Sequence, residues 1–136
     1  MSSAKNIVII GVGSNINPKI NIRKAKELLK NQSLVLGESK FVKTKPIGNK
    51  NQDDYLNGAI LAATSQPRIK FKFTLRKIES QLGRKRRGAQ APARYGPRTI
   101  DLDILVWNGK IVGKDFYTRD FIRKSVLELM PGLTKG

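Results

Sequence analysis

Apolar and polar positions vary along the chain in stretches typical of β-strands and of helices. Strands are expected at residues 7–12, 34–44, 55–64 and 100–107. The first of these, "IVIIGV", is continuously apolar and β-branched, so both of its faces should be buried. The dipeptide Asn108-Gly109 is a strong two-residue turn signal and predicts a hairpin into a short strand at residues 110–112.

Three other segments carry apolar residues at helical spacing. Asn17-Pro18 offers a helix cap followed by proline in the first turn of a helix that ends near residue 31. A second helix is expected to begin at residues 65–67 and to stop at Gly83, with one side formed by Ile69, Phe73, Ile78 and Leu82. Thr118 can cap a last helix, which Pro131-Gly132 ends.

The order of these elements is β-α-β-β-α-β, followed by the hairpin and the C-terminal helix. This order predicts an α+β, ferredoxin-like fold: a mainly antiparallel sheet with helices on one face. We find no internal repeat and no linker, so residues 1–136 are expected to form a single domain.

The composition narrows the chemistry that the chain can perform. It contains no cysteine and no histidine, which leaves carboxylates, Lys, Arg, backbone amides and bound ions. The formal charge of +17 indicates a polyanionic partner: nucleic acid, acidic lipid headgroups or a small phosphorylated ligand. No apolar run approaches the roughly 18 residues of a membrane span and no signal-peptide pattern occurs, so a cytoplasmic location and no membrane partner are expected.

Asp101 and Asp103 stand two residues apart inside the most apolar part of the last long strand. Side chains alternate along a strand, so both carboxylates should share one face, about 7 Å apart. They could lie on a solvated face, pair with nearby arginines, or hold Mg²⁺ ions that also bind phosphate. The preceding segment, residues 84–98, carries six positive side chains and no acid, and its glycines and prolines predict a flexible flap. Carboxylates beside mobile arginines favour phosphoryl transfer.

The stretch "RYGPRTIDLDI" resembles the R-W-G-P-R-x-x-D-L-D-I signature of the 6-hydroxymethyl-7,8-dihydropterin pyrophosphokinases. Three further stretches agree with that family in order and spacing, and the resemblance covers about residues 6–112. They are "GVGSN", "TKPIGNKNQDDYLNGA" and "IESQLGRKR". By itself, "GVGSN" lacks the third glycine and the lysine of phosphate-loop fingerprints, and a tight strand exit explains it as well.

The resemblance implies transfer of pyrophosphate from ATP to the hydroxymethyl oxygen of a pterin in folate biosynthesis, with two Mg²⁺ ions and AMP as a product. It implies that Asp101 and Asp103 are the magnesium ligands and that the ATP phosphates are held by Arg84, Arg86 and Arg98. Matching positions for the pterin site are Thr44, Ile47, Tyr55 and Asn57. Tyr95, which replaces the signature tryptophan, can stack on the flat ring. Glu79 can act as a partner for the metal or an arginine, and a monomer is expected.

The C-terminal part departs from the family pattern, which expects Pro-His after the hairpin and then Arg-x-Phe. The histidine has no counterpart in "YTRDFIRKSVLELMPGL". The best placement puts Arg123 on the family's arginine and Ser125 on its phenylalanine. Basic residues of this segment are candidates for contacts to the triphosphate: Arg119, Arg123 and Lys124.

Two alternatives to the pterin enzyme stay open. A paralogue could transfer a phosphoryl or pyrophosphoryl group to another small hydroxylated acceptor. A ferredoxin-like nucleic-acid-binding module would also fit the charge, but RNA-binding versions of this fold present aromatic residues on the two central strands. The first strand, "IVIIGV", has none, so nucleic acid is the less favoured partner.

Overall fold

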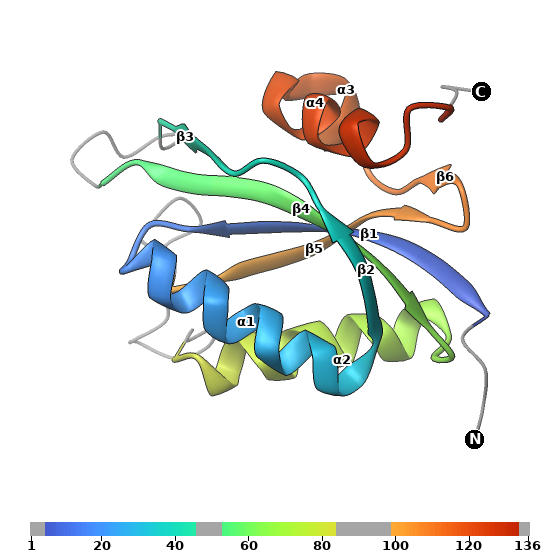
Figure 1. Cartoon of the computed structure of the whole chain (residues 1–136), viewed down its shortest axis with the longest axis horizontal. Coiled ribbons are helices and arrows are strands. Elements are labelled where there is room, and N and C mark those ends of the chain that lie inside the picture. The colour runs from blue at the N-terminus through green and yellow to red at the C-terminus, as the bar shows by residue number, and fades with distance from the viewer. Residues whose placement is uncertain (1–4, 46–52, 84–98, 134–136) are drawn as a thin grey trace.

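The computed structural model describes residues 5–45, 53–83 and 99–133, which form one antiparallel sheet with helices on both of its faces (Figure 1). The strands are β1 (Asn6–Ser14), β2 (Leu34–Glu38), β3 (Val42–Thr44), β4 (Tyr55–Thr64), β5 (Asp101–Trp107) and β6 (Lys110–Ile111). The helices are α1 (Pro18–Gln32), α2 (Arg68–Gln81), α3 (Asp115–Thr118) and α4 (Asp120–Leu129).

The order of strands in the sheet is β2-β4-β1-β5-β6, and β3 also pairs with β4. Every strand pair among the described residues is antiparallel. Strand β1 therefore lies between β4 and β5. In the sequence, α1 lies between β1 and β4, and α2 lies between β4 and β5, as in the crossovers of a ferredoxin-like domain. The predicted α+β, ferredoxin-like fold is confirmed. The expected helices on one face are α1 and α2, and the C-terminal helices α3 and α4 lie on the other face.

Two hydrophobic layers lie on opposite faces of the sheet. Helices α1 and α2 cover one face, where Val8, Ile10 and Val12 of β1 pack against them. The C-terminal helix α4 covers the other face, where Ile9 of β1 packs with Val126. Figure 1 shows the two pairs of helices on opposite sides of the sheet. The expectation that β1 is buried on both faces is confirmed, since its three middle residues Val8 to Ile10 are each 0% exposed.

The second predicted strand is divided into two short strands, both paired with β4. The ladder is interrupted at Ser39, whose Oγ accepts a hydrogen bond from the backbone N–H of Ala59 at 2.8 Å. The Ser39 side chain takes the place of a backbone acceptor. The residues between β2 and β3 therefore depart from regular strand geometry while the N–H of Ala59 keeps a hydrogen-bond partner.

Helix α2 buries a different face from the predicted one. Ile69 and Phe73 are 72% and 69% exposed, whereas the fully or almost fully buried apolar residues of the helix are Phe71, Leu75 and Ile78. Both sets have helical spacing, so periodicity alone does not decide between them. The prediction for Ile69 and Phe73 was wrong, because the sheet lies under the other stripe.

Two predicted helix caps also differ from the structure. Asn17 precedes α1 in the left-handed conformation (φ 40°) and its side chain makes no capping hydrogen bond. Instead, the Nδ2 group of Asn21 donates to the carbonyl of Ile16. Thr118 ends α3 rather than capping the last helix, and Arg119 separates α3 from α4 in an extended conformation. No helix in the described ranges has the length and apolar character of a membrane span.

Ser14 and Asn15, the last two residues of "GVGSN", join the exit of β1 to the starts of two other strands. The Ser14 hydroxyl donates to the carbonyl of Thr99 at 2.6 Å, directly before β5. The Asn15 Nδ2 group donates to the carbonyl of Asp53 at 3.1 Å, directly before β4. Both side chains are buried, at 0% and 4% exposure. This motif therefore fixes the entry of the two strands that flank β1.

Replacing Ser14 by alanine is expected to lower the free energy of unfolding by about 1–3 kcal/mol, because the carbonyl of Thr99 loses a donor that is itself fully buried. Urea denaturation followed by circular dichroism measures the effect. Ser80→Ala is the matched control, since Ser80 is exposed on α2 and alanine is the better helix former. Equal stability of the two variants would contradict the anchoring role of Ser14.

Candidate active site

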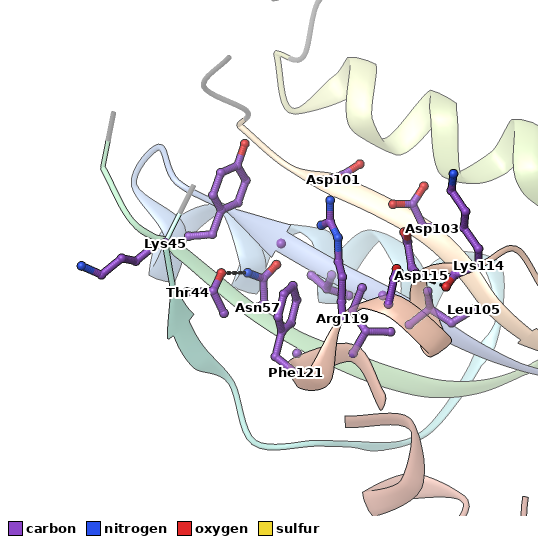
Figure 2. A pocket seen from close by; sticks show the side chains of 17 residues that line it. Thr44, Lys45, Asn57, Asp101, Asp103, Leu105, Lys114, Asp115, Arg119 and Phe121 are labelled. Carbon is purple, nitrogen blue, oxygen red and sulfur yellow. Dashed lines mark hydrogen bonds between the residues drawn. The ribbon is translucent and has the colours of Figure 1, made fainter. Parts of the chain in front are cut away.

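A cavity of about 450 Å³ lies between the sheet and the segment that contains α3 and the start of α4. Its walls come from β1, β4 and β5 on one side and from residues 114–122 on the other (Figure 2). Five of the predicted site residues line this one cavity. They are Thr44, Tyr55, Asn57, Asp101 and Asp103.

Glycines of β1 form the floor of the cavity. Gly11 and Gly13 line it, and they pair in the sheet with Asp103 and Asp101 of β5. A Cβ atom on Gly13 would lie 2.3 Å from Oδ1 of Asn57, so no larger residue fits unless the amide moves. The absence of side chains here leaves a flat backbone surface that a planar ligand could approach closely.

The Asn57 side chain is held by its neighbour on β3. Its Nδ2 group donates a hydrogen bond to the Thr44 hydroxyl, and Thr44 is paired in the ladder with Tyr55 (Figure 2). Residues at this diagonal separation on antiparallel strands lie within side-chain reach. The bond fixes the orientation of the amide, which retains a second N–H and a carbonyl oxygen for a ligand.

Asp101 and Asp103 lie on the cavity face of β5, as the alternation along the strand predicts. The residue between them, Leu102, is 0% exposed and packs with α1 and α2 on the opposite face. The Asp103 side chain is 51% exposed. In the ranges that the structure describes, no group of three Asp or Glu residues is arranged to hold a metal ion.

Two carboxylates on one strand face are oxygen donors of the kind that Mg²⁺ prefers, so their chemistry fits this ion. They do not complete its octahedral shell. A Mg²⁺ ion here would take its remaining ligands from water and from phosphate oxygens, which is how protein sites usually hold this ion.

Cationic side chains approach the cavity from the opposite wall. Arg119, at the junction of α3 and α4, extends toward β5, and Lys114 lies near the acidic pair (Figure 2). Lys45, after β3, lines the outer end. The Phe121 ring lies beside Asn57. Cations, paired carboxylates and the aromatic rings of Tyr55 and Phe121 therefore surround the same volume.

Arg123 and Ser125, the residues placed on the family's Arg-x-Phe, do not line the cavity. The Arg123 guanidinium donates to the Asp120 carboxylate and to the carbonyl of Phe116. Ser125 is 7% exposed on the side of α4 that faces the sheet. The sequence reasoning passed over Phe121, although Arg119-Asp120-Phe121 is itself an Arg-x-Phe, four residues earlier. The Arg-x-Phe spacing is the signal that could have found it.

Glu79 is 0% exposed and does not line the cavity. Its Oε1 accepts a hydrogen bond from Nη1 of Arg76 at 2.5 Å, and its Oε2 accepts one from the backbone N–H of Leu102 at 2.7 Å. Glu79 therefore contacts the strand of the acidic pair from the helical side of the sheet. The other predicted site residues lie outside the described ranges: Ile47, Arg84, Arg86, Tyr95 and Arg98.

Fold and cavity together define a ferredoxin-like α+β protein with an acidic pair and facing cations, a site suited to a phosphorylated ligand and its metal. Comparison with protein families identifies the particular group. Residues 9–131 match the model of 7,8-dihydro-6-hydroxymethylpterin-pyrophosphokinase, and the chain belongs to this family. The resemblance found from the four motifs is confirmed.

Individual relatives agree with the family assignment. The chain is 32% identical to the 2-amino-4-hydroxy-6-hydroxymethyldihydropteridine pyrophosphokinase of Haemophilus influenzae, over 91% of this chain and 81% of that protein. It is 30% identical to the protein of the same name from Aquifex aeolicus, over 93% and 81%. It is 37% identical to the Bacillus subtilis protein of that name, over 76% and 60%.

Gly13→Ala is expected to weaken binding of a pterin ligand by ~10-fold or more, because the new methyl group displaces the Asn57 amide from its place beside Thr44. Fluorescence titration with a pterin analogue measures the affinity. Gly132→Ala is the matched control, since nothing lies within 4 Å of a Cβ atom at that position. Unchanged affinity in Gly13→Ala would show that the amide orientation does not matter for the ligand.

Proposed function

We propose that this chain transfers the pyrophosphoryl group of ATP to the hydroxymethyl oxygen of 6-hydroxymethyl-7,8-dihydropterin, a step of folate biosynthesis, and releases AMP. Membership of the family implies ATP as the cosubstrate. The observation that carries the residue roles is that Asp101 and Asp103 line the same cavity as Asn57 and Arg119. A metal-binding wall, a heterocycle-binding wall and a phosphate-binding cation thus enclose one space.

On the pterin side, Asn57 and Thr44 act as a fixed pair. The Thr44 hydroxyl holds one N–H of the Asn57 amide, so the second N–H and the carbonyl oxygen present a donor and an acceptor in a set orientation. The edge of a pterin ring carries the complementary pattern. Tyr55 and Phe121 offer apolar ring surfaces in the same cavity as Asn57, and Tyr95 remains a proposed stacking residue.

On the nucleotide side, Asp101 and Asp103 would hold Mg²⁺, and we retain the expectation of two ions. When bound there, the ions would neutralise phosphate charge and orient the oxygens of the transferring group. Arg119 and Lys114 supply further positive charge from the facing wall. Arg84, Arg86 and Arg98 are proposed to hold the triphosphate from the remaining side.

The transfer itself requires no covalent enzyme intermediate. The hydroxymethyl oxygen forms a bond to the β-phosphorus of ATP, and the bond from that phosphorus to the oxygen bridging it to the α-phosphate breaks. AMP leaves with the bond's electron pair, and the hydroxyl proton is lost to water. Such a displacement depends mainly on alignment and charge neutralisation. A chain without histidine or cysteine can supply both.

The function is tested by measuring AMP formed from ATP, Mg²⁺ and the hydroxymethyl pterin. Asp101→Asn or Asp103→Asn is expected to reduce kcat by ~100-fold or more, since each removes a charged metal ligand. Glu27→Gln is the matched control, because Glu27 is an exposed carboxylate on α1, remote from the cavity. If the wild-type protein forms no pterin-dependent AMP, the proposed function is wrong; if both aspartate variants keep full activity, the metal assignment is wrong.

Arg119→Ala is expected to weaken binding of a non-hydrolysable ATP analogue by ~10-fold, because a cation facing the acidic wall is lost. Arg123→Ala tests the other placement of the family's arginine and should leave the affinity nearly unchanged, since its guanidinium is engaged by Asp120 and Phe116. Isothermal titration calorimetry with each variant compares the two. A larger loss in Arg123→Ala than in Arg119→Ala would restore the earlier placement.

A further inference from the structure

Two side chains of α2 bind both backbone groups of Leu102, the residue between the paired aspartates. The Glu79 carboxylate accepts from the N–H of Leu102 at 2.7 Å, and Nη2 of Arg76 donates to its carbonyl at 2.9 Å. Arg76 and Glu79 are joined to each other at 2.5 Å. We call this group of two side chains the α2 clamp.

The clamp takes the place of a neighbouring strand. Strand β5 pairs with β1 along one edge, but on its other edge β6 reaches only Val106 and Trp107. In the described part of the chain, no strand lies beside Leu102 on that edge. An exposed strand edge can shift or twist, since its N–H and C=O groups have no partner from the sheet. The clamp provides an acceptor for the N–H of Leu102 and a donor for its carbonyl, and Leu102 is the residue between the two aspartates.

Arg76 also reaches the acidic pair directly. The same Nη2 that binds the Leu102 carbonyl lies 3.4 Å from Oδ1 of Asp103. Burial of the guanidinium lowers its pKa, but Glu79, Asp103 and Asp101 outweigh burial and raise the pKa above its ordinary value, so Arg76 is permanently charged. Its planar fork contacts a buried carboxylate, a strand carbonyl and a cavity carboxylate at once. The ammonium group of a lysine cannot reproduce this arrangement.

We propose that Arg76 is a positioning residue that fixes the Asp103 carboxylate and the backbone of β5 in the geometry required for metal binding. The inference rests on the proposed magnesium site at Asp101 and Asp103. Partners that orient metal ligands typically contribute 10- to 100-fold to metal affinity or activity. The positive charge of Arg76 by itself would repel a cation, so a loss of metal affinity on its removal requires the orienting role.

The test measures Mg²⁺-dependent binding of a non-hydrolysable ATP analogue by calorimetry, without pterin and without turnover. Arg76→Ala would leave the buried Glu79 carboxylate without its cation, so the variants used are Arg76→Lys and the double variant Arg76→Gln with Glu79→Gln. Both keep a donor for the clamp, and thermal unfolding checks that each is folded. The half-saturating Mg²⁺ concentration is expected to rise ~10-fold or more in both. Exchange of the Leu102 amide hydrogen, followed by NMR, should accelerate in the double variant.

Lys77→Gln is the control, because Lys77 is the next residue on α2 and is exposed, so this variant removes a positive charge from α2 without touching the clamp. The proposal is overturned if Arg76→Lys binds Mg²⁺ and analogue like the wild type, or if either variant binds Mg²⁺ more tightly. If the wild type binds the ATP analogue in a Mg²⁺-dependent way but forms no AMP, the proposed transfer is wrong and the proposed role of Arg76 is unaffected. Absence of metal-dependent binding in the wild type would overturn both.

Discussion

Strand β1 has no polar face, and the burial of both its faces determines the arrangement of the other elements. Val8 and Ile10 require the cover of α1 and α2, while Ile9 requires the cover of α4 on the opposite side. The cavity lies on the second face, under α3 and the start of α4, where β1 carries glycine instead of a large apolar side chain. The site is therefore the part of this face that hydrophobic packing leaves uncovered.

The same alternation that buries Leu102 brings Asp101 and Asp103 to the cavity, so β5 serves two purposes in successive residues. Its apolar residues pack it against the helical layer, and its acidic residues face the cavity. Such a strand has to keep its register, because a shift by one residue would exchange the two faces. Two sets of hydrogen bonds to the backbone restrict that shift. Ser14, at the end of β1, binds the carbonyl of Thr99 before β5, and the α2 clamp binds Leu102.

Local sequence signals predicted the long strands β1, β4 and β5, the turn at Asn108 and the shared face of the two aspartates, because these depend on alternation and on backbone preferences within a few residues. They did not predict the division of the second expected strand into β2 and β3. They did not predict which stripe of α2 is buried, since Phe71 and Phe73 both have neighbours at helical spacing and the sheet decides between them. They offered Arg119 as a candidate contact to the triphosphate but did not separate it from Arg123 and Lys124, and they did not find Arg76. Arg119 is brought to the cavity by the extended break between α3 and α4, and Arg76 by the packing of α2 against β5.

The wall formed by residues 114–122 comes from one continuous segment after the hairpin, whereas the acidic pair and the glycine floor come from the sheet. The paired carboxylates and the cationic wall that faces them are thus encoded in separate stretches of sequence. Mutations in the late segment can alter which molecule is accepted without disturbing the strand that carries the carboxylates. In such a protein the final fifth of the gene can diversify under selection while the central β-sheet stays constrained.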